Sequence, residues 1–197
     1  MKISRTLLLI VAVLVPPGVT AVVSRSLQYP RRFAEVVPDG VYRGGFPTAA
    51  HIQALRSEKH IKTVVSLTDL KDEPSCVEEV EAVKEGGLRL LRFPMPGDGR
   101  GEFSTLDQAA DAIGDKANWP VFFHCGAGKQ RSNAVLAAYR VRKCGWTIDQ
   151  ALNELEDKYD LDPEKESTLI DHLRAYAKRI VQPARMPRRP SKDTPDE

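Results

Sequence analysis

The stretch VFFHCGAGKQRS, residues 121–132, decides how this sequence folds. Its first four residues are bulky and mostly apolar, which predicts a short buried strand, and the residues from 131 to 143 have the character of a helix. The two glycines between them allow the backbone to curl so that successive N–H groups point inward. Because the following helix adds the positive end of its dipole, the sequence predicts a nest for a phosphate dianion at this turn.

Cys125 stands at the mouth of the predicted nest. The field that holds an anion also favours a thiolate over a thiol, so we expect a lowered pKa and a nucleophilic sulfur at neutral pH. Arg131, six residues later, can fold back and place its planar guanidinium on two phosphate oxygens. Ser132 can donate a hydrogen bond to the sulfur, and His124 is expected to fix the loop backbone rather than to act as a base.

Outside this turn, strand-like and helix-like segments alternate and are followed by a helical run. The predicted strands cover residues 40–43, 61–67, 88–93 and 121–124. The predicted helices cover residues 48–55, 74–84, 104–113, 131–143, 147–159 and 164–180. This order predicts an α/β domain with a mostly parallel central sheet flanked by helices, whose ligands bind at the carboxyl ends of the strands.

Capping residues mark the start of several of these helices. Thr48 and Ser104 are expected to cap the first and third helices, and Thr147 with Gln150 forms a capping box before the fifth. In the helix of residues 74–84, three apolar residues recur at helical spacing: Val77, Val80 and Val83. Such spacing is typical of a buried helix face.

The segment HCGAGKQRS, residues 124–132, resembles the HCxxGxxR(S/T) signature of the cysteine-based protein tyrosine phosphatase superfamily, in its dual-specificity-like branch. Residues 41–47 and 61–67 resemble two strands of that family, and the resemblance covers roughly residues 36–180. It implies that Cys125 is the nucleophile and Arg131 the phosphate clamp. The implied phosphate cradle is the backbone of Gly126, Ala127, Gly128, Lys129, Gln130 and Arg131.

The family also uses an aspartic acid on an upstream loop, which protonates the leaving oxygen and then activates water. Asp98 is our choice, because it follows a predicted strand in a segment rich in Gly and Pro that permits a mobile loop. Glu102 is the alternative. Asp107 and Asp111 are interpreted as exposed residues near the start of their helix, where the helix dipole favours them.

These features predict a phosphoric monoester hydrolase that works through a cysteinyl-phosphate intermediate on phosphotyrosine or other phosphoproteins. A phosphoinositide or inositol-phosphate phosphatase is the alternative, since Lys129 adds a cation beside the phosphate, and a non-catalytic phosphate-binding module is the third reading. A nucleotide-binding P-loop is excluded because its leading glycine would fall on Phe123 and its Ser/Thr on Gln130. A sulfurtransferase-like loop would leave Asp98 and Ser132 without a task.

The composition suits one globular domain, with 197 residues of which 42% are hydrophobic. A net charge of +2 gives no strong field for nucleic acid, and we expect no nucleic-acid partner. The three cysteines are too few for a disulfide framework and lack metal-site spacing, so no metal and no cofactor are expected. Cys76 and Cys144 are interpreted as structural or incidental.

The two ends of the chain differ in composition from its middle. Residues 1–27 place basic residues before an apolar run and a Pro-Pro-Gly break, which predicts either a signal peptide or an N-terminal membrane anchor. Both predict a cell-envelope location, and an anchor would bring membrane association. Residues 182–197 are Pro-rich and charged and are predicted to be disordered. Between them, residues 28–181 form the predicted phosphatase domain, which we expect to be a monomer.

Overall fold

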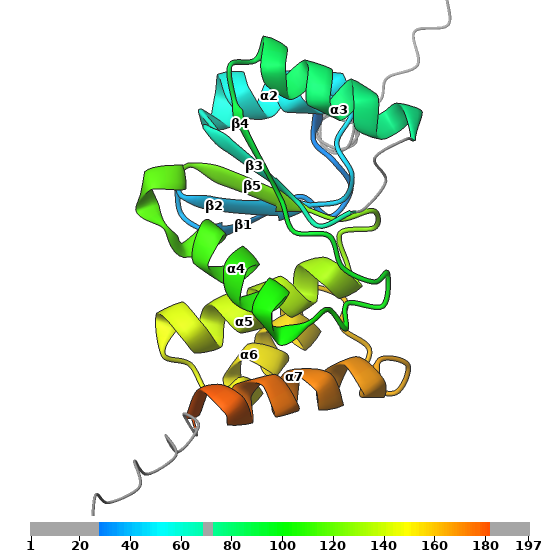
Figure 1. Cartoon of the computed structure of the whole chain (residues 1–197), viewed down its shortest axis with the longest axis vertical. Helices are drawn as coiled ribbons and strands as arrows, with labels where there is room; N and C mark the ends of the chain where they lie inside the picture. The colour runs from blue at the N-terminus through cyan, green and yellow to red at the C-terminus, as the bar shows by residue number, and fades with distance from the viewer. Residues whose placement is uncertain (1–27, 69–72, 182–197) are drawn as a thin grey trace, which may run out of the picture.

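The fold is a five-stranded sheet between two groups of helices, seen in a computed structural model that describes residues 28–68 and 73–181 (Figure 1). The strands are β1 (Ala34–Val37), β2 (Val41–Gly44), β3 (Thr63–Ser66), β4 (Arg89–Arg92) and β5 (Val121–His124). Their order is β1-β2-β5-β3-β4, with β1 antiparallel to β2 and the other pairs parallel. The predicted α/β class with a mostly parallel sheet is confirmed.

Helices cover both faces of the sheet (Figure 1). They are α2 (Ala49–Lys59), α3 (Pro74–Glu85), α4 (Phe103–Gly114), α5 (Gln130–Cys144), α6 (Ile148–Lys158) and α7 (Ser167–Val181). Phe122 packs toward α2 and α3, whereas its neighbours Val121 and Phe123 pack into the core under α4 to α7. This alternation buries β5 completely on both faces, as the parallel centre of a sheet requires.

The carboxyl ends of three strands meet at one point of the sheet. His124, the last residue of β5, pairs in register with Gly44 at the end of β2 and with Ser66 at the end of β3. The chain leaves β5 there and enters α5, whose residues from Ser132 to Val141 are all buried. The predicted anion nest therefore lies at the carboxyl edge of the parallel strands, where α/β sheets bind ligands.

Helix starts agree with the capping predictions in two of three cases. Thr48 caps α2, and Thr147 with Gln150 forms the capping box of α6. The predicted Ser104 cap is wrong, because α4 already begins at Phe103 and its N-cap position is Glu102, whose side chain makes no capping bond. Strand β1, an antiparallel edge strand of four residues, was not predicted.

Helix α3 buries only one of its three regularly spaced valines, Val83. Val77 and Val80 are 47% and 43% exposed. The residues that α3 buries are Cys76, Glu79, Ala82 and Val83. The helix is turned in this way because Glu79 faces a buried polar partner in β5, which is described below.

The predicted cell-envelope location, with a signal peptide or an N-terminal transmembrane segment, is contradicted. Within residues 28–68 and 73–181 the longest helices, α5 and α7, have 15 residues each, and none is long and apolar enough to cross a membrane. A spanning helix needs about 20 residues. The predictions for residues 1–27 and 182–197 lie outside the described residues, and the boundaries of the domain at 28 and 181 stay a prediction.

Candidate active site

The loop between β5 and α5 places Cys125 in a nearly closed environment, with 2% of its surface exposed. Its Sγ accepts hydrogen bonds from the backbone N–H of Gly128 at 3.2 Å and from the Ser132 hydroxyl at 3.3 Å. Burial, the largest influence, raises the pKa of Cys125. The Ser132 hydroxyl, the backbone N–H groups of Ser132 and Lys129 and the charge of Arg131 together outweigh it, so that the pKa is lowered overall.

Gly128 is the position where the loop requires a glycine. Its φ is +70°, in the left-handed region, and a Cβ added there would lie 2.6 Å from the backbone nitrogen of Gly45. The end of β2 therefore packs directly against the loop. The Phe46 N–H also donates to the carbonyl of Gly126 at 3.1 Å, so the segment after β2 fixes the outer side of the loop.

Three arginines hold three successive carbonyl groups of this loop. Arg31 Nη2 donates to Gly126 O at 3.1 Å, Arg32 Nη1 to Ala127 O at 3.1 Å, and Arg43 Nη2 to Gly128 O at 2.9 Å. Because the C=O of one residue and the N–H of the next point in opposite directions in a trans peptide, each carbonyl bound on the outside turns the N–H of the following residue inward. The arrangement can hold a phosphate dianion on those N–H groups. Sequence analysis missed the part that the arginines play.

Arg43 is a buried cation, with 1% of its surface exposed. Its Nη2 also donates to Asn133 Oδ1 at 2.8 Å, and its guanidinium carbon lies 4.2 Å from the centre of the Tyr159 ring. Burial lowers the pKa of Arg43 to about 10, although interactions with Tyr159 and Cys125 act in the opposite direction. The guanidinium therefore stays charged at neutral pH, beside the loop that is predicted to bind the anion.

His124 belongs to a buried polar cluster. Its Nε2 lies 2.5 Å from Oε1 of Glu79 in α3, and both side chains are completely buried. Glu79 Oε2 also accepts from Arg92 Nη2 in β4 at 3.1 Å. His124 was expected to fix the loop backbone, but the structure gives its ring a side-chain partner, and Nδ1 has no hydrogen bond within the described residues. Sequence analysis missed Glu79, because it lies between the valines that suggested a different buried face.

Arg131 folds back over the start of the loop. Its Nη1 donates to Leu67 O at 3.4 Å, after β3, and its Nη2 lies 3.2 Å from the point where a Cβ on Gly126 would stand. Lys129, in contrast, turns toward the region before α7, where its Nζ lies 3.7 Å from Glu166 Oε2. Lys129 is therefore not a simple solvated lysine. Ala127 and Gln130 complete the predicted cradle and are partly exposed.

The loop that carries Asp98 lies against the start of α5. The adjacent Gly99 has a φ of +82°, and a Cβ on it would stand 2.7 Å from Gln130 O. In Figure 1 the segment between β4 and α4 passes the start of α5 on the same side of the molecule. The structure thus brings the predicted Asp98 loop to the Cys125 loop.

The Asp98 carboxylate is held by its neighbour Arg100. Oδ1 accepts from the Arg100 backbone N–H at 2.9 Å and Oδ2 from Arg100 Nε at 2.8 Å. These two hydrogen bonds, the backbone one first, lower the pKa of Asp98. Its side chain remains 46% exposed.

The other acidic residues considered from the sequence either stand at a helix end or bind side chains of neighbouring helices. Glu102 stands at the N-cap of α4, while Asp107 accepts hydrogen bonds from Tyr176 and Arg179 of α7. Asp111 accepts two hydrogen bonds from Arg142 of α5. Asp107 and Asp111 thus join helices rather than merely facing solvent.

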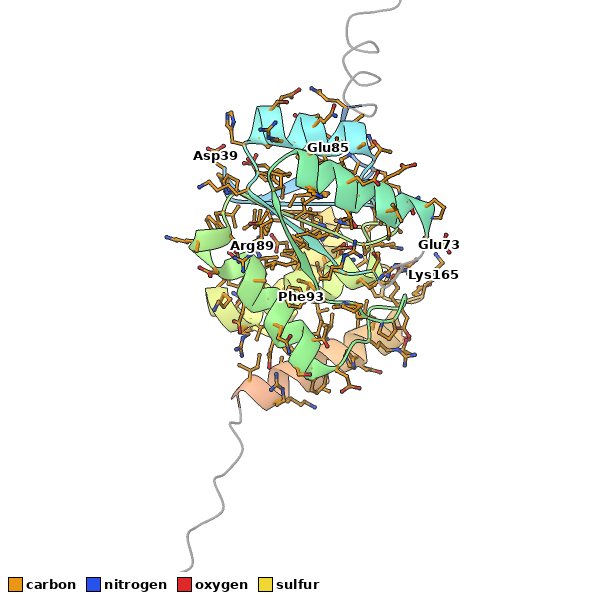
Figure 2. The ribbon with its side chains drawn as sticks, turned by 45° about the horizontal axis from the view of Figure 1, so that its top comes forward. Asp39, Glu73, Glu85, Arg89, Phe93 and Lys165 are labelled. Carbon is orange, nitrogen blue, oxygen red and sulfur yellow. The ribbon has the colours of Figure 1, made fainter. Side chains whose placement is uncertain are left out.

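The sticks in Figure 2 show how densely side chains fill the space between the sheet and its helices, with Arg89 and Phe93 labelled along β4 and the segment that follows it. In the part of the chain that the structure describes, no group of three or more His, Cys, Asp or Glu residues could hold a metal ion.

The comparisons with known proteins agree with this geometry. A family model described as "Tyrosine phosphatase family" matches residues 27–184. The inositol diphosphatase DSP2 of Oryza sativa subsp. japonica is 31% identical over 133 residues, 64% of this chain and 61% of that protein. The dual specificity protein phosphatase TpbA of Pseudomonas aeruginosa is 28% identical over 116 residues, 59% of this chain and 50% of TpbA.

A solved structure, the catalytic core of Siw14, superposes with a TM-score of 0.62 at 22% identity, covering 78% of this chain and 91% of that one. This likeness supports the fold. The chain matches only about half to three fifths of the length of its curated relatives.

Proposed function

The chain belongs to the tyrosine phosphatase family, and from that membership we propose that it is a phosphatase whose nucleophile is Cys125. The observation that carries the proposal is the sulfur itself, buried in a ring of N–H groups and hydrogen-bonded by Gly128 and Ser132. Burial raises the pKa of Cys125, but the Ser132 hydroxyl, the N–H groups of Ser132 and Lys129 and the charge of Arg131 outweigh it, so that the pKa is lowered and the thiolate is favoured. A thiol that served only to fill the core would need neither donor.

The proposed reaction has two steps. The Cys125 thiolate attacks phosphorus, an S–P bond forms, and the P–O bond to the leaving group breaks. Water then attacks the phosphocysteine, the S–P bond breaks, and inorganic phosphate leaves with the thiolate restored. Arg131 and the N–H groups of residues 126–131 bind the phosphoryl oxygens in both steps, and Ser132 stabilises the departing sulfur in the second.

The state of Asp98 bears on the substrate. A carboxyl that accepts hydrogen bonds from Arg100 and has a lowered pKa is a poor proton donor at neutral pH, although it can serve as a base toward water. An alkyl or serine phosphate needs a proton on its leaving oxygen. A diphosphate does not, because its leaving group is itself a phosphate, a weak base. Asp98 as found here therefore suits a diphosphate better than an ester of an aliphatic alcohol.

We accordingly propose an inositol phosphate that carries a diphosphate group as the substrate class. The name of the rice relative, inositol diphosphatase, supports this choice, as does the chemistry of Asp98. A phosphoprotein substrate is the second candidate, which the similarity to the dual specificity protein phosphatase TpbA favours.

Steady-state kinetics on a panel of substrates tests both candidates. The purified chain should hydrolyse a diphosphoinositol polyphosphate and p-nitrophenyl phosphate, with kcat/KM for the diphosphate exceeding that for a phosphotyrosine peptide at least about tenfold, a gap of 1.4 kcal/mol. Vanadate should inhibit and a chelator should not. A preference for the peptide would favour the second candidate.

Two cysteine variants test the mechanism. Cys125→Ser should abolish turnover of every substrate, because a serine hydroxyl does not ionise in this nest. Cys144→Ser, at the exposed end of α5, is the matched control and should retain activity. Activity that survives in the Cys125→Ser variant, or failure to trap a phosphorylated thiol in the active protein, would remove Cys125 from the mechanism.

A further inference from the structure

Arg31 holds a cation at the outer edge of the loop that follows Cys125. The residue is exposed, and its Nη2 donates to Gly126 O at 3.1 Å. Its aliphatic stem lies over Gly45, because a Cβ on that glycine would come within 2.7 Å of Arg31 Cγ. The Gly45 N–H donates to Arg31 O at 2.8 Å, so backbone and side chain of Arg31 are both fixed at this edge.

Arg31 differs in its partners from Arg32, Lys129 and Arg100, the other cations at the rim of the loop. Each of these has a carboxylate within 4 Å: Arg32 has Asp160, Lys129 has Glu166 and Arg100 has Asp98. Arg131, which is partly exposed and has no carboxylate partner in the described part of the chain, is already assigned to the first phosphate by the proposed function. Among residues 28–68 and 73–181, Arg31 has no carboxylate partner, and the single hydrogen bond of its side chain is the one from Nη2. The rest of its guanidinium fork is thus available to an anion, without a carboxylate to displace.

We propose that Arg31 contacts a second phosphate group of the substrate, beside the phosphate held by residues 126–131. This inference rests on the proposed function. Gly126 turns its carbonyl to Arg31, and the N–H of Ala127 in the same peptide points the opposite way, toward the predicted phosphate site, so one peptide group lies between the guanidinium and that site. A substrate with a single phosphate does not reach Arg31. An inositol phosphate can place a neighbouring phosphate of its ring against the Arg31 guanidinium.

Arg32 is a matched control that the chain itself offers. It is adjacent in sequence, is similarly exposed, and donates to the next carbonyl, that of Ala127, at 3.1 Å. Its charge is already paired, because Nε lies 2.8 Å from Asp160 Oδ2. Substitution of either arginine removes one positive charge and one contact to a loop carbonyl, but only Arg31 should discriminate between substrates.

The experiment measures inhibition of p-nitrophenyl phosphate hydrolysis by orthophosphate, by inositol hexakisphosphate and by dioctanoyl phosphatidylinositol bisphosphate. In the Arg31→Gln variant, the Ki of inositol hexakisphosphate should rise about fivefold relative to the Ki of orthophosphate. In Arg31→Lys this ratio should rise less, because the positive charge is kept. In Arg32→Gln this ratio should stay within about twofold. The lipid arm shows whether the second phosphate comes from a headgroup or from a soluble inositol phosphate.

Calorimetric titration of the Cys125→Ser chain, with and without Arg31→Gln, gives the corresponding ratio of dissociation constants and requires no turnover. Absence of hydrolysis by the unsubstituted chain would then overturn the proposed function without touching the subsite. An equal change of the ratio in the Arg31 and Arg32 variants would mean that only overall charge matters. That outcome, or no change in either variant, would overturn the assignment of Arg31.

Discussion

Two sets of ionisable residues lie around the Cys125 loop, and they differ in their access to water. The buried set is Arg43, Glu79 and His124, and the exposed set is Arg31, Arg32, Asp98 and Arg100. A charge without water must be paired within the protein, so members of the buried set are tied to fixed partners and hold the loop in shape. Charges in water contribute little to stability and remain able to meet a substrate. We therefore expect substitutions in the buried set to lower the stability of the fold, and substitutions in the exposed set to change substrate specificity.

The largest effect is expected from Glu79→Ala. Removing this carboxylate leaves His124 and Arg92 without their shared partner, and breaking a buried pair in this way costs about 3–5 kcal/mol. The free energy of unfolding, from urea titration, should fall by this amount. Glu78→Ala, on the exposed side of the same helix, should leave it unchanged. Equal losses in the two variants would show that the buried set is not special.

Next in size is the effect of Ser132→Ala on catalysis. The hydroxyl lies 3.3 Å from Cys125 Sγ, and a hydrogen bond to a charged group contributes about 1.5–3 kcal/mol, so kcat should fall about 10- to 100-fold. The pKa of Cys125 should rise, which slows alkylation of the thiol by iodoacetamide at neutral pH. Ser104→Ala, exposed on α4, is the control. An unchanged pH profile of alkylation would contradict the role of Ser132.

The lowered pKa of Cys125 also makes the stability of the fold depend on pH. Because the pKa of Cys125 is lowered in the folded state, ionisation of the thiol stabilises the fold fully above the unfolded thiol pKa. This contribution is lost as the pH falls through the folded pKa. Ser132→Ala should make it smaller, which urea titrations across that pH range would detect.

The loop of residues 125–132 could be predicted because its chemistry is local. The strand, the two glycines, the cysteine and the arginine are consecutive, and the order of residues alone indicates a nest at a helix start. The family and the α/β class followed from the same stretch and are confirmed. The roles predicted for individual site residues stay proposals, although the structure brings Cys125, Arg131, Ser132 and the Asp98 loop together.

The buried set could not be found in this way, because its contacts join distant parts of the chain. His124 and Glu79 are 45 residues apart in sequence, and Arg43 lies 85 residues from the carbonyl that it holds. In α3 the spacing of the valines indicated a different buried face from the one that contains Glu79, and a glutamate is rarely buried unless it has a partner. That partner is visible only after the sheet has formed. The resemblance of residues 41–47 to a family strand was the one available signal for Arg43.

A smaller effect is expected in the exposed set from Arg100→Gln. Removing the guanidinium takes away the Nε bond to Asp98, so the pKa of Asp98 should rise toward its ordinary value. More of the carboxyl is then protonated near pH 5, and hydrolysis of an alkyl phosphate should increase a few-fold there, because exposed pairs contribute less than about 1 kcal/mol.

The control for this prediction is Arg56→Gln, an exposed arginine on α2. The pH profiles of an alkyl phosphate and of p-nitrophenyl phosphate give the measurement. If the alkyl profile does not move while the protein stays folded, Asp98 is not the proton donor, and Glu102 becomes the residue to test.

The smallest effect is expected from replacing valine by threonine on the exposed face of α3, and it tests the orientation of that helix directly. Val77 and Val80 are 47% and 43% exposed, whereas Val83 is 3% exposed and packs among the residues under α2 and α3. The two side chains have the same shape and similar helix propensity, so the change reports mainly on burial of a hydroxyl group. Val77→Thr and Val80→Thr should each alter the free energy of unfolding by less than about 0.5 kcal/mol, and Val83→Thr should cost about 1–3 kcal/mol. A loss at Val80 as large as that at Val83 would mean that α3 buries Val80 as well. Glu79 would then no longer face His124, and the distinction between the buried and the exposed set would no longer hold.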